Sequence, residues 1–402
     1  MELTQYGVED LQIVLQAFGQ LGEGILSGEA TEEVTAVNKK ELRLFKTKEA
    51  CQMIGRSDTF LKNLEKNDPT FAPMKVNGIR FYDLVLINKI RDKAGTRPTR
   101  PSNTNPIVMA ISNFKGGVGK SGTAKHLADY IALKGLRVLA VGLDPQGTDA
   151  LYYGIIPELE VRPDQTIRAA LLDDPSQIKN LISKTYFPGI DIIPGNLSLT
   201  EVEYKLNDFK DQMQKVKKLG FPDERLQSAF KFIKDDYDLI ILDCGPNLNI
   251  LTLNAIYAAN SLLIPVPPAL PDLASFCTYC TTLNEHLKGS EKNKHLDFFR
   301  VLISKHPKNR TADKISNMMI REFGSYVMPK SIVHSAEIEL AASKFCSVYE
   351  LPPSSKKTYS RAIDSMNTVF SEILDSMFTI WKTQSRSEAF ENSLSSKEIE
   401  HV

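Results

Sequence analysis

The chain has few cysteines, no long apolar run and no net charge, and each of these absences narrows what it can be. Five scattered cysteines in 402 residues argue against a disulfide framework and fit a reducing cytosol. No run of about 18 apolar residues occurs, so we expect no membrane-spanning helix. The 49 basic and 49 acidic side chains cancel, so any affinity for nucleic acid must come from local patches.

Features of a secretory signal and of a compact zinc site are also missing. The chain begins Met-Glu-Leu-Thr-Gln, without a basic start and an apolar core, so we expect a cytoplasmic protein. One close cysteine pair, Cys277 and Cys280, has no second pair beside it, and helix packing explains it better than zinc. Hydrophobic residues make up 42% of the chain, enough to bury a sizeable core.

Changes of pattern along the chain predict its domain organisation. Residues 1–40 begin with apolar residues spaced along one helix face, and such a helix needs a partner, either a second copy of the chain or the next domain. Residues 41–93 are predicted to form a compact unit, and residues 94–106, rich in Pro, Thr and Asn, a linker. Residues 107–382 would form the main domain, and the polar residues 383–402 a frayed tail.

The main domain alternates continuous apolar strands with helices. Such alternation predicts an α/β fold in which a parallel sheet is covered by helices on both faces. We expect one helix at Ser121–Lys134 and strands at Ile107–Asn113, Arg137–Leu143, Ile190–Ile193, Leu239–Leu242, Ser261–Val266 and Phe298–Ile303.

A glycine-rich turn between the first strand and the first helix carries the sharpest chemical signal. Its sequence is Lys115-Gly116-Gly117-Val118-Gly119-Lys120-Ser121. Glycines let backbone N–H groups approach phosphate oxygens, and a helix N-terminus adds partial positive charge. The spacing predicts a phosphate loop in which Lys120 neutralises the β- and γ-phosphates and the Ser121 hydroxyl binds Mg²⁺.

Two later apolar strands end in aspartate. One runs into Asp144-Pro145-Gln146, and the other into Asp243-Cys244-Gly245-Pro246. A carboxylate at such a strand end can hold Mg²⁺ through water, so Asp243 is predicted to be the Walker B residue. Asp144 is interpreted as a residue that helps to hold the metal, with a helix or turn cap as the alternative.

Together these segments resemble the deviant Walker A ATPases, whose phosphate loop begins with a second lysine, here Lys115. Partition, division-site and arsenite-pump ATPases and nitrogenase iron proteins share that lysine. The resemblance covers about residues 106–380. It implies that Lys115 contacts phosphates of the opposite subunit, so that ATP binding drives homodimerisation.

The resemblance also implies roles for individual residues. Lys115, Lys120 and Asp144 would be catalytic, with Asp144 orienting the attacking water, and Ser121, Asp144 and Asp243 would hold Mg²⁺. ATP or ADP would be bound by Lys115, Gly116, Gly117, Val118, Gly119, Lys120, Ser121, Gly122, Asp144, Pro145 and Gln146.

One residue departs from the family pattern. Gly142 stands where the family usually has another aspartate. A glycine cannot make the secondary polar contact of that aspartate, and the difference is expected to affect the rate of hydrolysis. Two further stretches fit the resemblance, Ile193-Pro194-Gly195-Asn196 and Ile264-Pro265-Val266-Pro267-Pro268, each after a predicted strand.

Residues 47–65 predict a helix–turn–helix, with Gly55 in the turn, Thr47 capping the first helix and Ser57 or Asp58 the second. Residues 74–82 predict a hairpin with an Asn-Gly turn, followed by a helix at 83–92. The unit resembles a winged helix of the MerR type. The likeness places Arg56, Thr59 and Lys62 in a major groove and Lys75 and Arg80 on phosphates. The alternative is a helical pair used only for protein contact.

A second group of basic residues lies near the C-terminus: Lys330, His334, Lys344, Lys356, Lys357 and Arg361. Partition ATPases bind DNA non-specifically, in the ATP state, through basic residues in this region. The resemblance therefore implies DNA contacts from Lys330, Lys356, Lys357 and Arg361. A solvated helix face is the other interpretation.

As a whole the sequence is similar to the large partition (ParA) ATPases that carry an N-terminal DNA-binding domain. The likeness implies a slow ATPase that is stimulated by DNA and by a ParB-type centromere-binding partner. It also implies a nucleoid-associated homodimer without a membrane anchor, whose ADP or ATP form represses its own operon. The alternative is a nucleotide-gated transcription repressor with no positioning role, which needs no stimulating partner.

Overall fold

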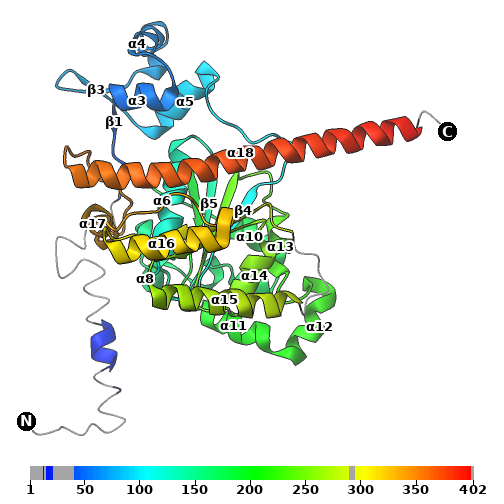
Figure 1. Ribbon diagram of the computed structural model, residues 1–402. Coiled ribbons are helices and arrows are strands. Elements are labelled where there is room, and N and C mark those ends of the chain that lie inside the picture. Colours follow the sequence, from blue (N-terminus) through cyan, green and yellow to red (C-terminus); the bar gives the residue numbers. More distant parts are fainter. Residues whose placement is uncertain (1–11, 13–14, 21–39, 289–294, 400–402) are drawn as a thin grey trace, which may run out of the picture.

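The computed structural model describes residue 12 and residues 15–20, 40–288 and 295–399, which include a small N-terminal unit and a larger α/β domain (Figure 1). Most of the helix predicted within residues 1–40 lies outside the described residues; residue 12 and residues 15–20 are helical. Among the described residues, no helix has both the length and the apolar character that crossing a bilayer requires.

The N-terminal unit combines three helices with a small antiparallel sheet, whose strand order is β1-β3-β2. The predicted helices and hairpin are confirmed as secondary structure. Their bounds are β1 Phe45–Lys46, α3 Thr47–Ile54, α4 Asp58–Asn67, a 3₁₀ turn at Pro69–Phe71, β2 Met74–Val76, β3 Ile79–Tyr82 and α5 Leu84–Ala94.

Local residue chemistry explains how this unit turns. Gly55 ends α3 at φ 72°, in the left-handed region that glycine tolerates, and the Ser57 hydroxyl accepts a hydrogen bond from the Phe60 N–H at the start of α4. Asn77 and Gly78 have φ values of 49° and 77°, as a two-residue hairpin turn requires. The predicted cap at Thr47 is wrong: Thr47 is already helical, and the Glu49 carboxylate accepts the Lys46 N–H at 3.1 Å.

A seven-stranded sheet forms the centre of the main domain, in the order β10-β9-β4-β8-β5-β7-β6. All neighbouring pairs are parallel except β6 with β7. The strands are β4 Ile107–Ile111, β5 Val138–Leu143, β6 Ser183–Lys184, β7 Ile190–Ile193, β8 Leu239–Cys244, β9 Ser261–Val266 and β10 Phe298–Ile303.

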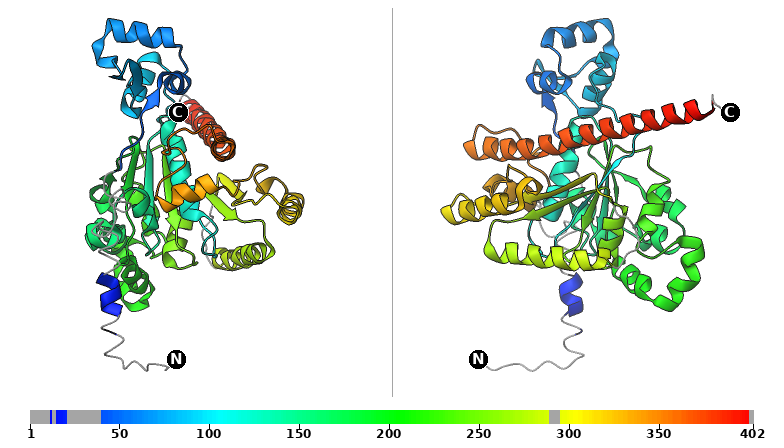
Figure 2. Two further views of the ribbon diagram at one scale, coloured as in Figure 1. Left: turned by 90° about the vertical axis from the view of Figure 1, so that its left-hand side faces the viewer. Right: turned by 45° about the vertical axis from the view of Figure 1, so that its right-hand side comes forward.

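Helices cover both faces of this sheet, as the continuous apolar strands predict (Figure 2). Ile107 and Met109 of β4 join one buried cluster, whereas Val108 and Ala110 join the other, because successive side chains point to opposite faces.

The α-helices are α6 Lys120–Leu133, α7 Thr148–Tyr152, α8 Pro157–Glu160, α9 Arg168–Leu172, α10 Ile178–Leu181, α11 Leu199–Asn207, α12 Phe209–Leu219, α13 Arg225–Phe230, α14 Ile250–Ala258, α15 Leu270–Lys288, α16 Arg310–Phe323, α17 Ala336–Ser343 and α18 Lys357–Ile399. Single 3₁₀ turns lie at Pro163–Gln165, Pro175–Gln177 and Gly324–Tyr326.

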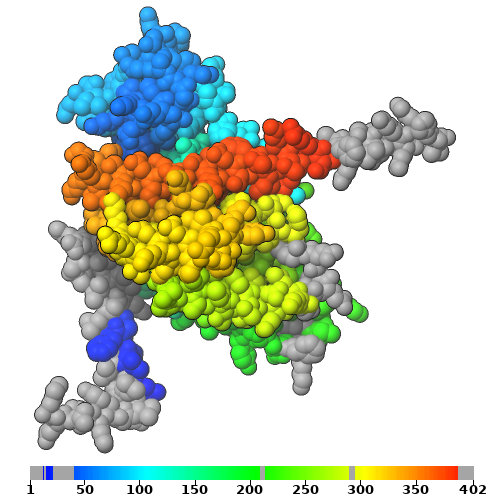
Figure 3. Space-filling view, in the orientation of Figure 1, coloured from blue at the N-terminus to red at the C-terminus, as the bar shows by residue number. Residues whose placement is uncertain are grey.

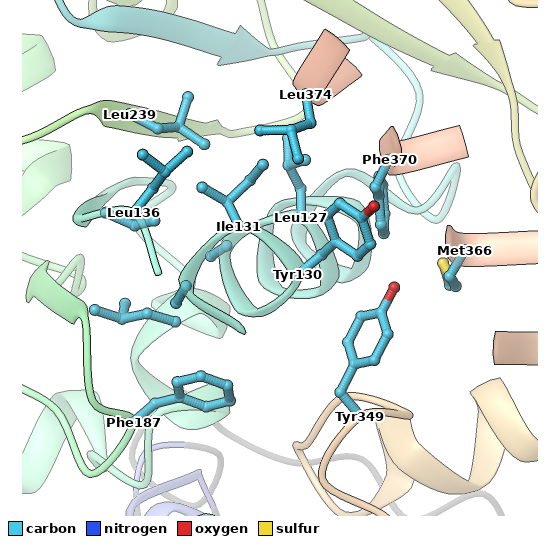
Figure 4. Close-up of a cluster of buried hydrophobic side chains, with 14 of the residues drawn as sticks. Leu127, Tyr130, Ile131, Leu136, Phe187, Leu239, Tyr349, Met366, Phe370 and Leu374 are labelled. Atoms are coloured by element: carbon cyan, nitrogen blue, oxygen red, sulfur yellow. The ribbon is translucent and has the colours of Figure 1, made fainter. Parts of the chain in front are cut away.

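An aromatic layer fixes α6 between the sheet and α18 (Figure 4). The ring of Tyr130 on α6 lies 5.8 Å from that of Phe370 on α18 and 6.1 Å from that of Tyr349. These buried rings hold the helix that starts at the phosphate loop, so the loop sits on a rigid support.

Residues 383–399, which were predicted to form part of a frayed tail, continue α18. Trp381 is 1% exposed, and its indole N–H donates to the Asn105 carbonyl at 3.0 Å. The Gln384 side chain accepts the Asn105 N–H at 3.0 Å. These contacts extend the docking of α18, which crosses the main domain on the side of the N-terminal unit (Figure 3).

The segment predicted as a linker is bound along the main domain. The Arg97 guanidinium donates to the Gly135 carbonyl at 2.8 Å, and that of Arg100 donates to the Lys234 carbonyl at 2.9 Å. Beside it, Arg91 of α5 donates to the Leu133 carbonyl at the end of α6, also at 2.8 Å. On the other side, the Lys40 ammonium donates to the Leu151 and Tyr152 carbonyls, each at 3.2 Å.

Candidate nucleotide site and basic surfaces

The predicted site residues meet at the carboxyl edge of the sheet. Strands β5 and β4 both pair with β8, so the loops that follow all three lie side by side. Ligands of open α/β sheets bind at this edge. The sheet order thus brings together segments that begin at residues 112, 144 and 245.

The glycine-rich turn has the backbone shape of a phosphate loop. Gly117 and Gly119 adopt φ values of 74° and 97°, and Gly119 is the N-cap of α6. The Ser304 hydroxyl donates to the Val118 carbonyl at 2.8 Å, and the Asn113 side chain accepts the Lys115 N–H at 3.2 Å. Neighbouring side chains therefore hold the loop in place.

Lys120 lies inside this loop. Its side chain is 7% exposed, and its ammonium donates to the Lys115 carbonyl at 3.2 Å. Burial lowers the pKa of Lys120, while Asp243 and Asp144 act in the opposite direction. A buried cation with one backbone acceptor is well placed to bind an anion such as a phosphate.

Asp243 and Ser121 face each other at the end of β8. Burial raises the pKa of Asp243 to about 7, against the effects of the nearby Ser121 hydroxyl and the Lys120 ammonium. The carboxylate oxygen Oδ1 of Asp243 is buried and has no hydrogen-bond partner. A cation bound beside this carboxylate would favour its charged form.

Asp144 begins the turn after β5. Its Oδ1 accepts the Gln146 N–H at 3.0 Å, which is the capping contact considered from sequence. Asp144 nevertheless faces the site, since a Cβ added to Gly245 would lie 3.6 Å from its carboxylate carbon. Asp144 is thus both a turn residue and a third acid at this edge of the sheet.

These donors fit Mg²⁺ held mainly through phosphates and water. A hydroxyl and carboxylates are the oxygen ligands that the ion prefers, and it usually keeps several waters. Within residues 40–288 and 295–399, no group of three His, Cys, Asp or Glu side chains is placed to coordinate a metal directly. Ser121 would therefore be the direct ligand, with Asp144 and Asp243 holding waters of the coordination shell.

Lys115 points to a different partner. Its ammonium lies 2.9 Å from the Asp272 carboxylate in the first turn of α15, and the lysine side chain is 40% exposed. The residue is thus held at the rim of the site in the single chain. Asp272 was not predicted, because its helix lies about 150 residues from the loop in sequence.

Sequence reasoning also missed Lys305. It follows β10, has a φ of 48°, and donates from its ammonium to the Gly117 carbonyl at 2.7 Å. A Cβ added to Gly119 would lie 3.7 Å from the Lys305 side chain. The end of β10, at the carboxyl edge of a parallel sheet, was the signal that could have identified it.

Asp149 is the other residue that sequence reasoning missed. Burial raises its pKa well above the usual value, with a further contribution from Asp243. It shares a small cavity with Ser121 and Asp243. A second carboxylate seven residues after Gly142, the position of the missing family aspartate, was the available signal.

The basic residues of the N-terminal unit are largely paired with acids. Lys62 contacts Asp58 at 2.8 Å, and Lys75 contacts Glu65. Arg80, only 14% exposed, lies 3.4 Å from Asp58. Arg56 donates to the Ala94 carbonyl, and Thr59 is exposed. The structure shows two consecutive helices, α3 and α4, and their role in DNA binding stays a prediction.

The C-terminal basic residues lie around α17 and the start of α18. Lys330, Lys344, Lys356 and Lys357 are exposed, whereas Arg361 is half-buried and its Nε has no hydrogen-bond partner. His334 contacts Glu339 at 2.9 Å. The exposed lysines remain accessible to a polyanion, and Arg361 is the least accessible of the predicted contacts.

Comparison with known sequences finds one matching family model and several similar proteins. A family model described as an AAA domain matches residues 107–297. SopA of Escherichia coli K12 is 31% identical over 348 residues, which cover 84% of this chain and 89% of SopA. A Sinorhizobium fredii protein that carries the name replication protein A is 33% identical over 362 residues, covering 85% of this chain and 88% of its own.

Comparison with solved structures supports the same fold. A structure described as a partition protein matches with a TM-score of 0.61 at 21% identity, covering 89% of this chain and 98% of that one. A cobyrinic acid a,c-diamide synthase from Mycobacterium smegmatis, with a bound ATP analogue and magnesium, matches at 0.52 and 20%, covering 67% and 94%. At these identities the matches establish the α/β P-loop fold alone.

Proposed function

This chain belongs to the ParA/SopA-type partition ATPases, and from that premise we propose that it is an ATP- and Mg²⁺-dependent switch that segregates DNA. One observation carries the proposal: Lys120, Ser121 and Asp243 converge at the N-terminus of α6 beneath a loop with two left-handed glycines. A phosphate and a metal ion can be bound there together, beside the carboxylate of Asp243.

In this mechanism the chain's own groups position the triphosphate. The loop amides and Lys120 bind the β- and γ-phosphates, and Ser121 and Asp243 hold the metal, which neutralises charge that develops on the phosphates. Asp144 orients the attacking water. Lys115, as in deviant Walker A loops, leaves Asp272 and contacts phosphates of a second subunit, so that ATP closes a sandwich dimer until hydrolysis removes the charge.

DNA enters the proposal in two places. The N-terminal unit acts as a winged helix–turn–helix that binds an operator and represses the chain's own operon. The support is its geometry: α3, Gly55 and α4 form the helix pair, and β2 and β3 form the wing. The exposed lysines near α17 and α18 bind nucleoid DNA without sequence preference in the ATP state. A ParB-type centromere-binding partner then stimulates hydrolysis and release.

The test is steady-state ATP hydrolysis and Mg-ATP retention, with and without DNA and the partner protein. We expect slow hydrolysis that rises when both are added, and complete loss in Lys120→Ala. Lys308→Ala removes an exposed lysine elsewhere and should behave as the wild type. Retention of Mg-ATP by Lys120→Ala at the wild-type level would contradict the proposed site. Hydrolysis that responds to neither DNA nor partner would contradict the segregation cycle alone.

A further inference from the structure

The carboxylate of Asp149 occupies the space that a side chain at position 142 would need. A Cβ added to Gly142 would lie 2.1 Å from Oδ2 of Asp149 and 2.4 Å from its Cγ and Oδ1. Atoms cannot approach that closely, so the two positions are mutually exclusive. While the carboxylate from α7 occupies this place, residue 142 can only be glycine.

Asp149 is held in this position by backbone rather than by an ion pair. The Gly195 N–H donates to Oδ2 of Asp149 at 3.3 Å. Gly195 must itself be a glycine, because a Cβ there would lie 2.8 Å from the Asp144 carbonyl oxygen and 3.3 Å from Oδ1 of Asp149. The Pro194-Gly195 stretch after β7, which had no assigned role, therefore anchors this carboxyl group.

One oxygen of Asp149 remains without a protein partner. Its Oδ1 is buried and makes no hydrogen bond, and the same holds for Oδ1 of Asp243. Both residues line a small cavity together with Ser121, with room for about one water. A water of a metal ion's coordination shell carries two hydrogens and could donate to both unpaired carboxylate oxygens around such a cavity.

We propose that Asp149 is a third acid of the Mg²⁺ site, holding together with Asp243 a water of the metal's shell, and that it replaces a carboxylate that β5 lacks at Gly142. The inference rests on the proposed nucleotide function. Asp149 contacts neither phosphate nor metal directly and is a positioning residue. Its removal should change the dependence of nucleotide affinity on Mg²⁺ while leaving metal-free binding through Lys120 intact.

The experiment measures the affinity for a fluorescent ATP analogue across free Mg²⁺ concentrations, with EDTA giving the metal-free value. Asp149→Asn keeps the shape of the side chain, and we expect its half-saturating Mg²⁺ concentration to rise about 10-fold or more, the usual cost of losing an outer-shell partner. Asp164→Asn, at an exposed loop aspartate, is the matched control and should match the wild type.

An exchange variant makes the test specific. Gly142→Asp alone should lower the thermal unfolding midpoint, because its side chain overlaps Asp149. Combined with Asp149→Ala, the same Asp at position 142 should recover much of the wild-type Mg²⁺ dependence. An Asp149→Asn protein with wild-type Mg²⁺ dependence, or an exchange variant no better than Asp149→Ala, would overturn the assignment. A wild-type protein that bound no nucleotide would overturn the proposed function and this inference together.

Discussion

The ion pair between Lys115 and Asp272 leads to a quantitative prediction about dimerisation. In the proposed sandwich dimer each Lys115 must leave its own Asp272 to reach the phosphates of the other subunit. The contact spans 2.9 Å, and the lysine side chain is 40% exposed. Exposed pairs contribute roughly 0.2–1 kcal/mol each. Breaking two of them therefore opposes dimerisation by roughly 0.4–2 kcal/mol.

Asp272→Asn removes this opposition. The ATP-bound dimer should become about 2- to 30-fold tighter, because roughly 0.4–2 kcal/mol at 25 °C corresponds to that change in the equilibrium constant. Sedimentation equilibrium with a non-hydrolysable ATP analogue measures the dissociation constant directly. The difference from wild type should shrink at high salt, where exposed charges are screened.

Glu285→Gln supplies the matched control, since it removes the same charge from an exposed position on the same helix, α15. It should leave the dimer dissociation constant unchanged. A dimer of Asp272→Asn that is no tighter than the control's would refute the reasoning, and would indicate that Lys115 is not required to change partners.

Three further predictions follow from other contacts. Lys305→Met should weaken ATP binding about 10-fold in a fluorescence titration, because the variant loses one charge-assisted hydrogen bond to the loop, worth about 1.5 kcal/mol at an exposed position. The control Lys308→Met should bind ATP as the wild type does, and equal affinities of the two variants would count against a role for Lys305. Burial lowers the pKa of His126 to about 4, and Nε2 of its ring accepts the Val348 N–H. In the unfolded chain the His126 ring becomes protonated from about pH 6.5 downward, whereas in the folded chain it stays neutral down to about pH 4. The stability that this difference in pKa contributes is therefore complete above pH 6.5 and is lost as the pH falls towards 4. The loss of stability between pH 7 and 5 amounts to about 2 kcal/mol. The thermal unfolding midpoint of His126→Gln should therefore depend less on pH than that of the wild type, and identical pH profiles of the two proteins would reject the argument. Replacing Lys356, Lys357 and Arg361 by alanine should lower the salt dependence of non-specific DNA binding, and an unchanged slope would remove these residues from the DNA surface.

Sequence reasoning identified the parts of this protein that depend on local chemistry. Continuous apolar runs predicted the parallel strands, because both faces of the sheet are buried. Glycine and lysine spacing predicted the phosphate loop, since phosphate binding constrains adjacent residues. The Asn77-Gly78 turn was likewise predicted from two residues and is present in the structure.

What the sequence did not predict depends on packing between distant segments. Asp272 and Lys305 reach the loop only because β9 lies beside β4 and β10 lies beside β9 in the sheet. Asp149 was missed because its carboxylate fills the space that a side chain at position 142 would need, and sequence spacing does not reveal this contact. Residues 383–399 look polar and frayed, yet the Gln384 side chain accepts the N–H of Asn105, 279 residues away in sequence.

The contacts that attach the N-terminal unit have a consequence for any dimer of this chain. Carbonyls at the end of α6 and in the turn after it accept hydrogen bonds from Arg91 and Arg97, while Lys40 donates to the Leu151 carbonyl in the segment after β5. The small unit thus has little freedom to swivel. In a dimer, the separation between two such units would be dictated by how the ATPase domains pair. If the units bind DNA as proposed, this pairing would set which half-site spacing, in steps of about 34 Å per helical turn, the two units can span.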